Sequence, residues 1–149
     1  MRLIAALIGL VAFSAGALAE TPPTSDDFAA AQALLRWYLP GHKPSRRASK
    51  SLFVCVAGAE LPQQVVRALQ DDTGRQFRPC GEYETTEPEG TIGGNLSIVI
   101  GKPEQRSDGD FDVTWNYYCG GLCGGSSMAI LRRDASGWHV VKFEERLIQ

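Results

Sequence analysis

A stretch of alternating side chains, followed by a glycine-rich bend, limits what this chain can fold into. From residue 111 to residue 119 every second position carries a bulky apolar or aromatic side chain or a cysteine: Phe111, Val113, Trp115, Tyr117 and Cys119. A period of two residues in a segment rich in aromatic side chains is typical of a β-strand with one buried face. Residues 120–125 then contain four glycines, which allow a reversal, and residues 126–133 are expected to form the returning strand.

The first 19 residues have the pattern of an export signal. Arg2 precedes an apolar run at 3–13, and Ala17-Leu18-Ala19 fits a small-residue cleavage site before Glu20. The apolar run is short for a membrane span, although a retained amphipathic or membrane helix is the alternative. We expect cleavage after Ala19, which leaves one domain at 20–149, without a transmembrane segment, in the periplasm or outside the cell.

The charge balance argues against one class of partner. Without Arg2 the 15 basic residues become 14 against 17 acidic ones, a net charge near −3. Proteins that bind nucleic acid usually present a basic surface to the phosphates. We therefore expect no nucleic-acid partner, and an envelope protein or a peptide is the kind of partner that an exported chain would meet.

Two segments have the spacing of amphipathic helices. The first follows a capping Thr24 or Ser25 and ends at Pro40-Gly41, with an apolar stripe at Phe28, Ala31, Leu34, Leu35, Tyr38 and Leu39. The second opens at Pro62 and ends before Gly74, with Val65, Val66 and Leu69 turned inward.

The remaining periodic segments are expected to be strands, and they lie at 52–57, 77–83, 95–100, 111–119, 126–133 and 138–143. Turn residues such as Asp108-Gly109 and Asp134–Gly137 separate the later ones, which predicts antiparallel neighbours. The fold class is therefore α+β: two helices packed on a mostly antiparallel sheet with a C-terminal four-stranded meander.

The cysteine count suits an exported chain. All four cysteines lie in the mature part, and an even number in such a protein points to two disulfides, for which three pairings exist. We predict Cys55–Cys80, because one helix joins the two strands that carry them. We also predict Cys119–Cys123, because they are close in sequence at a glycine-rich turn. Thiol-redox or metal chemistry at Cys119 and Cys123 is the alternative.

Known signatures of catalysis and metal binding fit the chain poorly. Asp108, Asp110 and Asp112 resemble the start of a calcium loop, but its glycine and glutamate positions are Val113 and Cys119. A pairing of Ser126 or Ser127 with His139 is the only suggestion of a hydrolase. The sequence therefore assigns no catalytic, cofactor or metal residue and favours a non-enzymatic structural or binding module, although an enzyme stays open.

The residues around the glycine-rich bend also resemble those of other proteins. Tyr117-Tyr-Cys-Gly-Gly-Leu-Cys-Gly-Gly125, followed by Gly137-Trp138-His-Val-Val141, resembles a group of small exported bacterial proteins of unknown function. An apolar strand followed by a proline-initiated helix, here 52–69, is part of the same likeness. The resemblance implies export and the α+β layout, and it brings no activity, cofactor or catalytic residue.

The expected location of Trp115 and Trp138 depends on whether the apolar face of the sheet is buried or open. If its apolar face packs under the helices, both indoles lie largely in the core. If that face is open, they form an aromatic surface suited to sugar or peptide binding. We expect the core placement for both.

Overall fold

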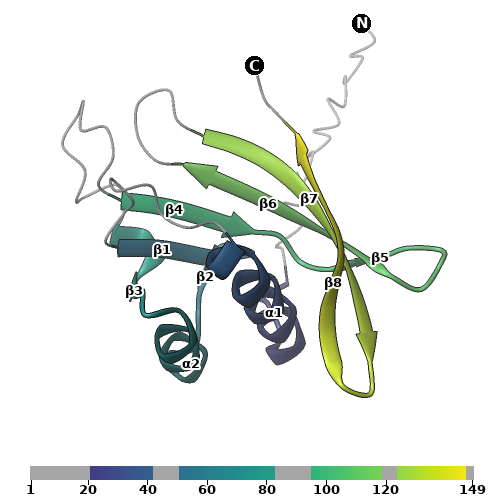
Figure 1. Cartoon of the computed structure of the whole chain (residues 1–149), viewed down its shortest axis with the longest axis horizontal. Helices are drawn as coiled ribbons and strands as arrows, with labels where there is room; N and C mark the ends of the chain where they lie inside the picture. Colours follow the sequence, from purple (N-terminus) through teal and green to yellow (C-terminus); the bar gives the residue numbers. More distant parts are fainter. Residues whose placement is uncertain (1–20, 42–50, 83–94, 119–123, 147–149) are drawn as a thin grey trace, which may run out of the picture.

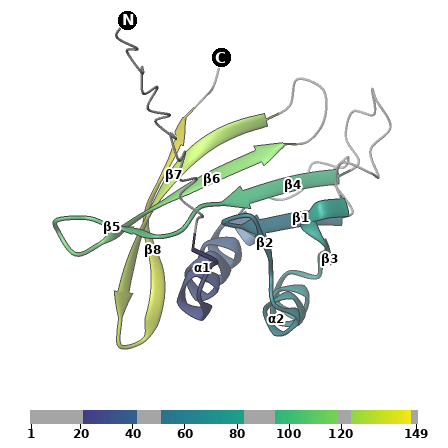
Figure 2. The same ribbon diagram turned by 180° about the vertical axis from the view of Figure 1, so that it is seen from behind.

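The computed structural model describes residues 21–41, 51–82, 95–118 and 124–146, which form two α-helices and one mostly antiparallel sheet. Figure 1 and Figure 2, seen from opposite sides, both place the two helices on the same face of the sheet. The predicted α+β class and the two helices are confirmed. Residues 1–20, with the predicted export signal, lie outside the described residues.

Helix α1 (Ser25–Gly41) begins with a reciprocal cap. The backbone N–H of Asp27 donates to Thr24 Oγ1 at 3.3 Å, and the Thr24 N–H donates to the Asp27 carboxylate at 2.7 Å. This exchange satisfies backbone donors that have no partner inside a helix. Four residues of its predicted apolar stripe are buried, and Phe28 and Tyr38 of the same stripe are half-buried. The buried four are Ala31, Leu34, Leu35 and Leu39, and Ala30, which was not predicted, is buried with them.

Helix α2 (Gln63–Thr73) lies between Pro62, which occupies the N-cap, and Gly74. Gly74 has φ +65° and donates its N–H to Gln70 O at 2.8 Å, a left-handed ending that glycine adopts without strain. Leu69 is buried and the two valines that precede it are half-buried, as the spacing predicts.

The sheet has eight strands in the order β2-β1-β4-β6-β7-β8, while β3 pairs with β1 and β5 pairs with β6. Their bounds are β1 Ser51–Val56, β2 Ala59–Glu60, β3 Gln76–Arg78, β4 Asn95–Ile100, β5 Glu104–Gln105, β6 Phe111–Tyr118, β7 Gly124–Asp134 and β8 Gly137–Arg146. A short 3₁₀ helix, Cys80–Glu82, follows β3.

The predicted C-terminal meander is confirmed, since β4, β6, β7 and β8 are antiparallel neighbours. The register also agrees: Val113 and Trp115 are buried toward the helices, whereas Thr114 and Asn116 are exposed. Strand β8 continues past Phe143, the expected end, to Arg146. The two-residue strands β2 and β5 were not predicted, because segments so short carry no periodic signal.

Strand β1 is the centre of the other half of the sheet. It pairs in parallel with β4 along its whole length and, on its other edge, in parallel with β3 and antiparallel with β2. On this edge β3 pairs with Ser51–Phe53 and β2 pairs with Cys55 and Val56. Val54 lies between the two pairings and has no partner there. The apolar run at 52–57 forms this central strand, and its Leu52, Phe53, Val54 and Val56 are buried.

Candidate binding pocket beside the Cys55–Cys80 disulfide

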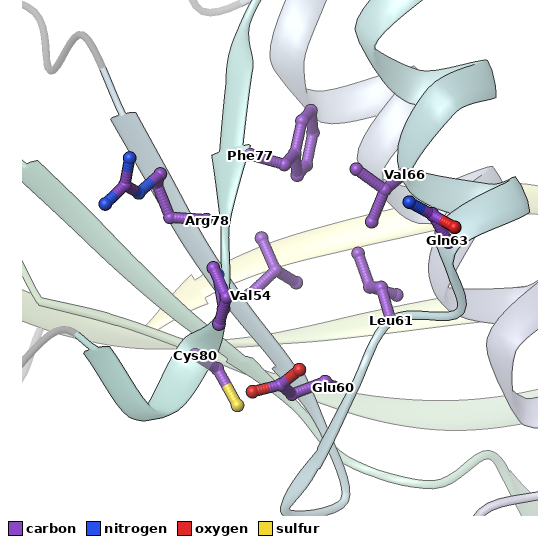
Figure 3. A pocket seen from close by; sticks show the side chains of 9 residues that line it. Val54, Glu60, Leu61, Gln63, Val66, Phe77, Arg78 and Cys80 are labelled. Atoms are coloured by element: carbon purple, nitrogen blue, oxygen red, sulfur yellow. The ribbon is translucent and has the colours of Figure 1, made fainter.

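A pocket of about 390 Å³ lies at Val54, between the part of β1 that pairs with β3 and the part that pairs with β2. Its walls are side chains of β1, β2, β3 and α2, of the segment between β2 and α2, and of the residues that follow β3, as Figure 3 shows. The lining residues are Val54, Glu60, Leu61, Gln63, Val66, Phe77, Arg78, Pro79 and Cys80. Val54, Leu61, Val66 and Phe77 all belong to or pack against the hydrophobic core, so the inner wall is apolar.

The Cys55–Cys80 disulfide confirms the pairing predicted from sequence, with a Cα–Cα distance of 5.4 Å. The cysteines are 25 positions apart, and the loop that they close contains β2, α2 and β3. Every lining residue except Val54 lies in this covalent loop or is Cys80 itself. One covalent bond therefore fixes the ends of the segment that builds almost the whole pocket wall.

Charged and polar groups are confined to the outer part of the pocket. Arg78 forms an ion pair with Glu82, at 3.1 Å between Nη2 and Oε2, and both side chains are largely exposed. Among the residues that the structure describes, Glu60 has no ion-pair partner. Figure 3 shows its carboxylate on the same side of the pocket as the Cys80 sulfur, while the Arg78 guanidinium points away from the cavity.

The second predicted pair, Cys119 and Cys123, lies outside the described residues, and that disulfide stays a prediction. The strands on either side are described: Tyr118, the last residue of β6, is paired with Gly124, the first residue of β7. The two cysteines are therefore the residues next to a paired position on each strand of the hairpin.

The structure does not bring the hydrolase candidates together. Ser127 is opposite Glu145, while His139 is opposite Arg132, five residues away along β7, which is about 17 Å at the usual rise. His139 instead contacts the Ser136 hydroxyl and the Asp134 carboxylate, both at 3.0 Å and both through Nε2. A catalytic triad needs the acid and the serine on different ring nitrogens. This Ser-His-Asp cluster therefore holds a turn and is not arranged for catalysis.

The carboxylates of the calcium-loop candidate are bonded to arginines. Arg132 donates to both Asp110 oxygens, at 2.8 and 2.9 Å, and Arg106 donates to Asp108 and Asp112. The guanidinium of Arg132 lowers the pKa of Asp110 below its ordinary value. The predicted Asp-Gly turn is present, with Gly109 at φ +90°, so a turn and an arginine cluster explain the aspartate spacing.

The two tryptophans differ. Trp115 is fully buried and contacts the rings of Tyr38 and Phe143, at centroid distances of 4.5 and 6.3 Å. Trp138 is half-buried, and its indole N–H donates to Asp26 at 3.2 Å. The core placement is confirmed for Trp115. For Trp138 it holds only in part, because this residue lies near the hairpin end, where α1 contributes a polar partner instead of an apolar cover.

The sequence predicted Val66 on the inward face of a helix and Phe77 in a strand, but it did not predict the pocket. The missing element was β2 and the turn before it, in which Ala57 and Gly58 have φ +46° and +76°. The Ala-Gly pair at the end of an apolar run was the available signal for this turn. Without it, Glu60 and Leu61 could not be brought back beside β1.

A comparison with protein-family models, one with curated proteins and one with solved structures each find no match for this chain. None of the described helices is both long and apolar enough to cross a membrane.

Proposed function

We propose that this protein is an exported, non-enzymatic binding module whose ligand occupies the pocket beside the Cys55–Cys80 disulfide. The observation that carries the proposal is an apolar cavity whose walls, except for Val54, lie on one covalently closed loop. Ligand sites are usually concave and apolar, with a few polar groups that fix orientation, and span about 300 to 1,000 Å³. A cavity of about 390 Å³ suits a small ligand.

The export part of the proposal rests on the first 19 residues and on the disulfide, since such bonds persist mainly in oxidising compartments. We place the protein in the periplasm or outside a bacterial cell, among the small exported proteins that its Cys119–Cys123 hairpin resembles. Amino-terminal sequencing of exported material is expected to begin at Glu20. Exported material that retains Met1 would count against this part.

The binding part is tested by filling the pocket. Val66→Trp places a larger side chain on the inner wall, and we expect at least a tenfold loss of affinity for the neutral apolar dye N-phenyl-1-naphthylamine. Val141→Trp is the matched control, because Val141 is 50% exposed on β8, outside the pocket. Circular dichroism checks that both variants fold. Equal dye binding by the wild type and both variants would refute the proposal.

The second candidate is thiol-redox or metal chemistry at Cys119 and Cys123. It is favoured by their positions in the sequence: Cys119 directly follows Tyr118 and Cys123 directly precedes Gly124, and these two neighbours are paired on β6 and β7. Intact-mass analysis with and without a reductant, under denaturing and native conditions, separates the candidates. Two disulfides and no bound metal favour the binding module, whereas two free thiols or a bound ion favour the second candidate.

A further inference from the structure

We infer that the ligand of this pocket is a small apolar molecule with a positively charged amine, whose ammonium group is held by the Glu60 carboxylate. This inference rests on the proposed function and adds the chemical class of the ligand. It follows from three properties of the pocket: an apolar inner wall, a rim carboxylate without an ion-pair partner among the described residues, and a neighbouring strand edge too short for a peptide.

The inner wall determines the apolar part of the ligand. Val54, Leu61, Val66 and Phe77 offer only carbon atoms to the cavity, and Figure 3 shows the side chains of Leu61, Val66 and Phe77 grouped on one side of it. An alkyl chain or a single ring placed against them leaves water and gains roughly 25 cal/mol for each Å² of apolar surface that it buries. The wall itself makes no distinction between ligand charges.

The rim determines the charge. Arg78 is bonded to Glu82 and directed away from the cavity, and Gln63 is neutral. Glu60 is left as the one lining acid without an ion-pair partner in the part of the chain that the structure describes. A carboxylate beside an apolar wall favours a cation and disfavours an anion. An ammonium also donates hydrogen bonds, which a carboxylate accepts well.

The edge strand argues for a free small molecule over an extended peptide. A peptide that adds to a sheet edge gains affinity mainly from a row of main-chain hydrogen bonds. The edge beside this pocket is β3, which has only three residues, and the next residue, Pro79, has no N–H to donate. The edge therefore offers too few backbone partners to hold a peptide strand.

The experiment uses three probes with the same chain: octylamine, octanol and octanoate, each displacing N-phenyl-1-naphthylamine from the full-length mature protein at pH 7. We expect octylamine to bind about threefold to fivefold more tightly than octanol, because an exposed carboxylate contributes a modest attraction. Octanoate is expected to bind more weakly than octanol. Added salt should reduce the differences and leave octanol unchanged.

Two variants make the result specific to this carboxylate. Glu60→Gln should equalise octylamine and octanol while octanol affinity stays the same. Glu104→Gln, which removes an exposed acid on β5, changes the net charge equally and should keep the preference.

The outcomes separate the two proposals. If octanol binds and Val66→Trp abolishes its binding, but Glu60→Gln leaves the preference for octylamine intact, the inference about the amine is overturned and the pocket remains the site. If Val66→Trp changes the affinity of none of the probes, both the proposed function and the inference about the amine fail. A peptide that binds the wild type more tightly than octylamine and depends on Val66 would also overturn the inference.

Discussion

The two ends of the sheet are held together in different ways. At the C-terminal end β6, β7 and β8 have 8, 11 and 10 residues, so the strands are held by long ladders of backbone hydrogen bonds. At the opposite end β2 and β3 have 2 and 3 residues and pair with only part of β1 each. The short pairings offer little stabilisation alone, and there a disulfide closes the segment that carries them.

The difference shows where this chain can form a cavity. The meander pairs along nearly its whole length, with one register shift between Ile130 and Leu131, and packs its inner face on α1. Between β3 and β2, Val54 of β1 has no strand partner on that edge, and the pocket lies there. A disulfide can hold such an interrupted edge in place where backbone hydrogen bonds between strands are missing.

The largest expected effect comes from Trp115, the bulkiest fully buried side chain among the described residues. Trp115→Ala should lower the free energy of unfolding by about 3 to 5 kcal/mol, because a fully buried indole is replaced by a cavity. Chemical denaturation measures the loss. Trp37→Ala is the control, since Trp37 is 48% exposed, and should cost about 1 kcal/mol or less. Equal losses for the two variants would contradict the core role of Trp115.

The next effect should fall on one end of the sheet. Replacing both Cys55 and Cys80 by serine removes the constraint on a loop of 25 residues, which the chain-entropy model values at about 3.5 kcal/mol. Hydrogen exchange should show the greatest loss of protection in α2 and β3, while β6 to β8 keep more of theirs. Dye binding in the pocket should be lost as well. A uniform loss of protection along the chain would mean that the two ends do not differ in this way.

The meander end was the more predictable of the two. Its alternating residues, from Phe111 to Tyr117, and its Asp-Gly turns encode strand, face and register locally, and the structure confirms them. The pocket end depends on contacts that no local pattern records. The parallel pairing of β1 with β4 joins residues more than 40 positions apart, and β2 depends on one turn at Ala57-Gly58. In the sequence, only the predicted Cys55–Cys80 pair indicated that the residues on either side of α2 lie close together.

A smaller effect tests the close fit inside the meander. A Cβ added at Gly125 would lie 2.7 Å from Cε1 of Tyr117, the residue paired with it on β6. Gly125→Ala should therefore destabilise the protein by about 1 to 3 kcal/mol, and Tyr117→Ala in the same chain should remove most of that additional cost. Gly81→Ala is the matched control at the other end, because nothing lies within 4 Å of its added Cβ. A neutral Gly125→Ala would show that Tyr117 moves aside freely.

The smallest expected effect concerns acid stability at the meander end. The pKa of Asp110 is lowered by its hydrogen bonds from Arg132, so the unfolded chain binds a proton at this carboxyl more readily than the folded protein does. Its contribution to stability is therefore present above about pH 4 and is lost as the pH falls further. Asp134, whose pKa His139 and Ser136 also lower, acts in the same direction.

Asp110→Asn should reduce, and not abolish, the loss of stability between about pH 5 and pH 2.5, measured by denaturation at each pH. Asp71→Asn, an exposed change on α2, should leave the slope as in the wild type. If both variants keep the wild-type slope, the Arg132–Asp110 pair contributes nothing to acid stability.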